Sequence, residues 1–293
     1  MPDLKPPTTY EQQMETLRIR GCQIENDSFC VKILAQVNYY RLSAYFLPFA
    51  MGDDSYRPGT DFNKVYLIYE FDKQLRNIIS IAIEEVEINL RAKLAYYHAH
   101  KYGATGYLNA ENYNDKHRHK HKILMKMITD GIKNNGKAPF VKHHIDHYGG
   151  QFPIWAITEL FSFGMLSVFY ASMHLQDQKK FAKDEFDTTY RNLASWLRCC
   201  TDLRNICAHY GRLYFRKFTA VPARISGLDD DAARRLFGAV LSLKALHPDA
   251  DRWNNEIHLR LKKLVDSNSD FITLAHTGFP SDWDAKLRKS RRQ

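Results

Sequence analysis

The most regular hydrophobic pattern in the sequence lies between Phe62 and His100. Apolar residues recur there at steps of three and four, as on one face of an α-helix, at Phe71, Leu75, Ile78, Ala82, Val86, Leu90 and Leu94. The cationic residues His100 and Lys101, followed by Gly103, are typical of a helix that ends there. The pattern predicts one long helix over Phe62–His100.

Shorter stretches with the same periodicity fill most of the remaining chain, whereas the alternating pattern of strands is scarce. Before the long helix, we predict helices at Tyr10–Arg20 and Asp27–Val37, then an aromatic-rich segment up to Pro48. After it, the predicted helices are Ile154–Leu175, Thr188–Cys200 with a continuation to Tyr214, Asp229–Ala245 and Arg252–Val265. The fold class that follows is all-α.

The domain organisation predicted from the sequence is one compact body, because no Gly/Ser-rich linker or internal repeat divides the chain. Within it, residues 1–60 form an N-terminal helical segment and residues 61–220 a helical core. Residues 221–293 add C-terminal helices and a tail with five basic residues after Trp283, which we expect to be frayed and able to follow phosphates.

One run, Phe152–Met173, is long and apolar enough to span a bilayer and carries a single charge, Glu159. Serine and threonine residues interrupt it, and no distinctive Lys/Arg cluster lies on one side, so we interpret it as a buried core helix rather than a membrane helix. The chain start lacks the features of a secretory signal, and the 5 cysteines show no disulfide spacing. We expect a cytoplasmic protein.

The charge balance favours a polyanionic partner, since 42 Lys and Arg residues against 33 Asp and Glu give a net charge of +9. Histidines are concentrated in two polar stretches, residues 117–121 and 143–150. His143 and His147 share one helical face, but the sequence indicates no further ligands for a zinc site. We predict a basic, partly solvated surface with no metal or other cofactor, and keep zinc as the less favoured alternative.

The segment Leu203–Arg216, LRNICAHYGRLYFR, carries the most concentrated candidate chemistry. Arg204 and His209 form an Arg-x4-His pattern, which by itself is weak because two other Arg–His pairs match the allowed spacings. If the helix continues through this segment, one stripe contains Asn205, His209, Arg212 and Arg216, with Arg204 at its edge. The prediction is therefore an exposed face with one histidine, one amide and three guanidinium groups.

Such a set suits RNA cleavage without a metal. A histidine can exchange protons with the ribose 2′-OH and the leaving 5′-oxygen, while arginines stabilise the phosphate charge. The expected products carry a 2′,3′-cyclic phosphate and a 5′-OH. Because one histidine cannot easily serve as both acid and base, a second copy of the motif is required, which predicts a homodimer.

Four stretches in order, residues 36–49, 57–103, 153–170 and 204–216, resemble the AbiD/AbiF-like abortive-infection proteins of bacteria, a family with HEPN-like ribonuclease features. The resemblance implies an all-α, HEPN-like helical bundle with additional N-terminal helices. It further implies phage defence through RNA cleavage and growth arrest. In some members, a small structured RNA controls the activity.

The resemblance also assigns residues. Arg204, Asn205 and His209 match the catalytic pattern, and Arg212 and Arg216 match flanking basic positions. A polar run on the long helix matches positions that support the site, although a plain ion-pair network explains it equally well: Glu84, Glu87 and Arg91. The sequence departs from the family pattern at Tyr210, Tyr214 and Phe215, where a second histidine and a Trp-Asn pair are common; the aromatics there either stack on bases or pack.

Two hypotheses follow, with a third of narrower scope. The leading one is a toxin-like, metal-independent endoribonuclease that acts on RNA. The alternative is a non-catalytic module of a defence or toxin–antitoxin system that binds structured RNA through phosphates. In the third, the chain is the target of a partner nucleotidyltransferase, and Tyr210, a candidate RNA contact in the first two, is the residue modified.

Overall fold

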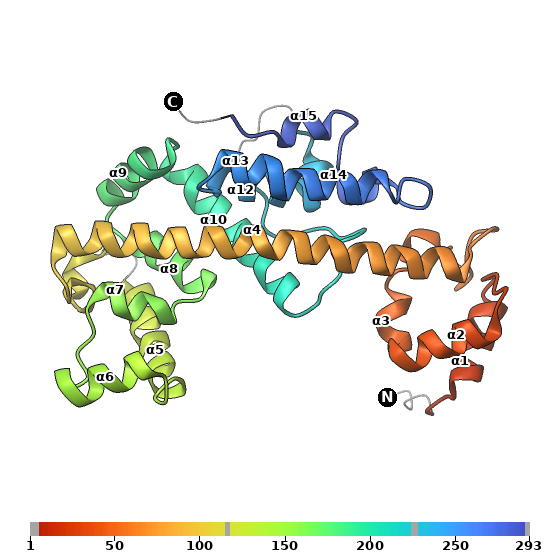
Figure 1. Cartoon of the computed structure of the whole chain (residues 1–293), viewed down its shortest axis with the longest axis horizontal. Coiled ribbons are helices and arrows are strands. Elements are labelled where there is room, and N and C mark those ends of the chain that lie inside the picture. Colours follow the sequence, from red (N-terminus) through yellow and green to blue (C-terminus); the bar gives the residue numbers. More distant parts are fainter. Residues whose placement is uncertain (1–5, 115–117, 224–227, 291–293) are drawn as a thin grey trace.

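A single long helix organises the structure. The computed structural model describes residues 6–114, 118–223 and 228–290, and helix α4 (Phe62–Tyr102) runs through it from end to end (Figure 1). The side chain of Asp61 begins the helix by accepting from the amide of Lys64 at 2.8 Å, and Gly103, at a φ of 78°, ends it. At 1.5 Å per residue the helix is about 60 Å long. The predicted long helix is confirmed.

The N-terminal helices pack at the start of α4 (Figure 1). They are α1 (Tyr10–Ile19), α2 (Asp27–Gln36) and α3 (Tyr39–Ser43), and a short 3₁₀ turn, Leu47–Phe49, follows them. A capping box between Thr9 and Gln12 fixes the beginning of α1, which contacts α2. The two helices predicted here are confirmed to within a residue.

The opposite end of α4 carries α5 (Arg118–Asn134), α6 (Pro139–Tyr148), α7 (Ile154–Ile157) and α8 (Phe163–Ser172), with the 3₁₀ turn Thr158–Leu160 between the last two. The prediction of one unbroken helix over Ile154–Leu175 is wrong, because Phe161 is extended and Ser162 caps a new helix by accepting from the amide of Met165. The run is nevertheless core, as its large apolar residues are mostly buried. Within the described ranges, no helix meets the length and hydrophobicity needed to cross a membrane.

The second half of the chain forms α9 (Leu175–Phe186), α10 (Tyr190–Ala208), α11 (Asp230–Ala233), α12 (Leu236–Leu246), α13 (Ala250–Arg252), α14 (Leu259–Asp266) and α15 (Trp283–Leu287). Helix α9 lies at the C-terminal end of α4, whereas α10, α12 and α14 pack along α4. Helix α10 contacts α4, α8, α9 and α12 and so lies at the centre of the core. A π-helical turn, Trp253–His258, joins α13 to α14.

Two predictions for this half need correction. The helix predicted at Asp229–Ala245 breaks because Arg235 is extended, and the second helix then packs so closely that a Cβ on Gly238 would lie 2.4 Å from the carbonyl of Ala233. The tail is not frayed over its described part: the Trp253 indole donates to Leu287 at 2.7 Å, and Lys289 bonds the side chain of Asn254. The last basic residues, Arg291 and Arg292, lie outside the described residues.

The all-α fold class is confirmed, since the described parts of the chain contain no β-strand beyond three isolated bridges.

A buried carboxylate joins α9 to the end of α4. The carboxylate of Asp177 on α9 is buried and accepts from the hydroxyls of Tyr97 at 3.0 Å and Tyr102 at 2.6 Å, and from Lys101. Burial would raise the pKa of Asp177, but these hydrogen bonds outweigh it and hold the pKa below its usual value.

Asp177→Asn should lower the free energy of unfolding by about 2 kcal/mol at pH 7, because an amide cannot accept at both positions. A depressed folded-state pKa adds stability at neutral pH that is lost as the pH falls below about 3.9. The difference between wild type and variant in urea denaturation should therefore shrink in acid. Asp184→Asn, which removes an exposed partner of Lys180 on the same helix, is the control and should change stability by less than about 0.5 kcal/mol.

Candidate functional site

The candidate segment leaves the helix earlier than the sequence suggested. Helix α10 ends at Ala208, and His209 is its C-cap residue, with its amide bonded to the carbonyl of Asn205 at 3.0 Å. Tyr210 follows in the left-handed region at a φ of 56°, which reverses the chain. The predicted stripe of Asn205, His209, Arg212 and Arg216 on one helix is therefore wrong beyond His209.

The end of α10 presents its polar residues to solvent. Asn205 and His209 are exposed and lie one turn apart, and the ring of Tyr210 is 70% exposed. Arg216 is exposed further along the chain. Arg212, in contrast, is half-buried and donates to the carbonyl of Ala44, and burial lowers its pKa.

Arg204 enters a cleft between the end of α10 and the middle of α4. The cleft has a volume of about 350 Å³, and its polar lining consists of Ser80, Glu84, Glu87, Arg91 and Arg204. The structure thus brings Arg204 together with the polar run predicted on the long helix. His209 is not among the residues that line this cleft, although Ala208, directly before it, is one of them.

Glu87 links the two arginines of this cleft. Its carboxylate accepts from Arg91 at 2.6 Å and lies 3.7 Å from the Nε of Arg204. Arg91 also donates to the carbonyl of Phe161 at 2.8 Å, which ties the cleft to the break between α7 and α8. The predicted Glu87–Arg91 pair is confirmed, and Glu87 additionally orients Arg204, whose side chain keeps 35% of its surface exposed.

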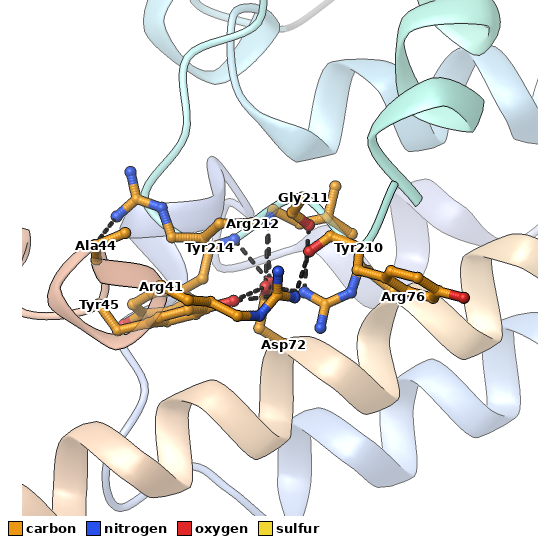
Figure 2. A network of polar contacts seen from close by, with 10 residues as sticks. Arg41, Ala44, Tyr45, Asp72, Arg76, Tyr210, Gly211, Arg212 and Tyr214 are labelled. Carbon is orange, nitrogen blue, oxygen red and sulfur yellow. Dashed lines mark hydrogen bonds and ion pairs between the residues drawn. The ribbon is translucent and has the colours of Figure 1, made fainter. Parts of the chain in front are cut away.

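A buried carboxylate on α4, which the sequence did not reveal, fixes the chain after His209. Figure 2 shows Asp72 beneath the turn that follows α10. Asp72 accepts from the amides of Tyr214 at 2.8 Å and Leu213 at 3.1 Å, from the hydroxyl of Tyr45 at 2.7 Å, and from Arg76. Its side chain is fully buried. These four donors replace the water that the carboxylate loses on burial.

Arginines complete this contact on both sides of the turn. Arg76 donates to the carbonyl of Gly211 at 3.2 Å, and Arg41 on α3 donates to the carbonyl of Tyr210. Arg212 reaches back to α3, as described above (Figure 2). We call the set of Arg41, Asp72, Arg76 and Arg212 the turn clamp. The sequence signal that could have revealed it is the i,i+4 spacing of Asp72 and Arg76 beside the apolar stripe of α4.

Two further groups of candidate reactive side chains are a thiol in the cleft and a histidine pair on α6. Cys207 lines the cleft, but burial raises the pKa of its thiol to about 12, so it is protonated at neutral pH. The rings of His143 and His147 lie 4.8 Å apart, and the part of the chain that the structure describes contains no group of three or more residues suited to hold a metal ion. His117 lies outside the described residues.

Asp72→Asn should lower the free energy of unfolding by about 3 kcal/mol, because the amide nitrogen would face other donors and Arg76 would lose its partner. Urea denaturation measures the effect. Asp54→Asn, which removes the exposed partner of Arg20, is the matched control and should change stability by less than about 0.5 kcal/mol. Equal stability of Asp72→Asn and wild type would show that the turn clamp contributes nothing.

Comparison with known proteins identifies the family. Residues 32–215 match the family described as Abi-like protein. The chain matches no curated protein and no solved structure. The family match begins in α2, includes all of α4 and α10, and ends in the turn held by Asp72. Because it covers well over half of the chain, the protein belongs to the Abi-like family, and this membership implies a role in phage defence.

Proposed function

We propose that the protein is a toxin-like, metal-independent endoribonuclease that arrests growth during phage infection. Arg204, Asn205 and His209 carry the reaction, and RNA is the substrate. The observation that supports this most directly is the position of His209. Its side chain is exposed at the end of α10, immediately beside the cleft that contains Arg204 and Arg91.

The chemistry divides between proton transfer and charge stabilisation. His209 takes the proton of the ribose 2′-OH, the 2′-oxygen attacks phosphorus, and the bond to the 5′-oxygen breaks. That oxygen leaves with a proton from a second imidazole. Arg204 stabilises the charge that develops on the phosphate, and Glu87 holds its guanidinium in place beforehand.

The second imidazole comes from a second copy of the chain in this proposal. Within one chain Arg204 faces the cleft while His209 faces solvent, so one copy presents only part of a two-histidine site. A homodimer with the ends of both α10 helices near the symmetry axis supplies the missing acid. We expect sedimentation equilibrium to give twice the 34.2 kDa mass of the chain.

A second candidate is a module that binds structured RNA, such as a small RNA antitoxin, without cleaving it. The observation in its favour is that Arg91 and Arg204 both contact Glu87, which leaves a cleft with balanced charge rather than a strong anion site. In this case Arg204 contributes to the affinity for RNA, and substitution of His209 changes that affinity little.

Purified wild type should cleave total RNA in EDTA and leave 2′,3′-cyclic phosphate and 5′-OH ends. His209→Ala should reduce the cleavage rate by at least about 100-fold, because it removes the proton-transfer group. Sequencing of both fragment ends after a timed incubation measures both effects.

His147→Ala, which removes an exposed histidine of α6, is the control for this experiment and should cleave like wild type. Unchanged cleavage by His209→Ala would overturn the proposed mechanism. RNA that copurifies with the protein but is never cut would favour the binding module.

A further inference from the structure

A second, larger groove lies on the N-terminal side of the candidate site. It has a volume of about 610 Å³ and is formed by the end of α2, by α3, by the first half of α4 and by the turn after α10. Its lining includes Asn38, Arg41, Tyr69, Lys73 and Tyr210. Two members of the turn clamp, Arg41 and Arg76, line the groove and bond the turn after α10, so the groove is fixed in position relative to the end of α10.

The side chains of this groove combine cations, amides and aromatic rings. No carboxylate belongs to its lining. Lys73 keeps 55% of its side chain exposed and forms an ion pair at 3.2 Å with Glu70, whose side chain is 29% exposed. Arg41 lies 5.9 Å from the centre of the Tyr69 ring and donates to the carbonyl of Tyr210. Tyr210 adds a ring that is 70% exposed.

The groove adjoins the cleft that contains Arg204. Both are lined by Ser80, Cys207 and Ala208, so they meet beneath the end of α10. From Tyr69 to Arg91 the two extend over about 33 Å of α4, at 1.5 Å per residue. This length fits a segment of roughly four or more nucleotides, the usual range for grooves that follow a single strand.

We infer that this groove binds a single-stranded segment of RNA and leads it to the end of α10. Lys73 and Arg41 contact phosphates, and a base stacks on Tyr210. Stacking favours a single strand over a duplex, because the bases of a duplex already stack on one another and their faces are not accessible. The inference deepens the proposed function and rests on it for the identity of the ligand as RNA.

The test measures binding separately from cleavage. A fluorescein-labelled single-stranded RNA of 12 nucleotides is titrated with His209→Ala protein in EDTA, and fluorescence anisotropy gives Kd at several salt concentrations. Lys73→Glu in this background should weaken binding by about tenfold and reduce its salt dependence. Lys180→Glu is the matched control, since Lys180 is also exposed and paired with a carboxylate on its own helix, and it should change Kd less than about twofold.

Tyr210 is tested by a matched pair in the same background. Tyr210→Phe should retain the affinity, because the stacking face is kept. Tyr210→Asn should weaken binding by about tenfold, because the ring is lost, while asparagine tolerates the left-handed backbone at this position. Circular dichroism checks that both variants are folded.

The outcomes separate the groove from the reaction. Normal binding by both Lys73→Glu and Tyr210→Asn would overturn the proposal that this groove binds RNA, even if wild type cleaves RNA through His209. Loss of binding in both variants supports the groove, whether or not wild type cleaves the same RNA. Equal affinity for the duplex form of the oligonucleotide would overturn the assignment to a single strand.

Discussion

The buried carboxylate of Asp72 is the interaction on which the candidate site depends. A carboxylate removed from water is tolerated only when donors replace its hydration, and here two backbone amides, a phenol and a guanidinium do so. These donors come from α4, from Tyr45 between α3 and the 3₁₀ turn Leu47–Phe49, and from the chain after α10. One charge therefore joins three parts of the fold, and the exposed end of α10 is held where they meet.

The long helix uses a second carboxylate for a parallel purpose. Asp72 holds the backbone of the turn, whereas Glu87, about four turns further along α4, holds the side chains of Arg91 and Arg204. The first fixes where the chain turns after His209, and the second fixes where a guanidinium points. Asp72 is needed because α10 ends at Ala208, so the helix itself positions only the residues up to that point.

The family match covers the whole candidate site. The matched residues, 32–215, contain both carboxylates of α4, both clefts and the end of α10. The chain beyond them forms α11 to α15, and of these α12 and α14 pack on α4 while α12 also packs on α10. The C-terminal helices thus pack against the two helices that carry the candidate site, and the chain around His276 contacts Tyr214 in the turn.

The sequence by itself determined several helices, among them α1, α2 and α4, because their apolar residues recur with the period of the element and local pairs such as Glu87 and Arg91 lie one turn apart. It also nominated Arg204 and the polar run of α4. It did not predict α5 and α6, which lie in the polar, His-rich stretch. Only the tertiary structure decided where the helices break and which residues, distant in the sequence, become neighbours. The stripe through Arg212 failed because α10 ends at Ala208 and the chain beyond it is held by Asp72, which binds amides 141 and 142 positions away. Contacts over such separations leave no periodic signal in a sequence, since they depend on how the elements pack.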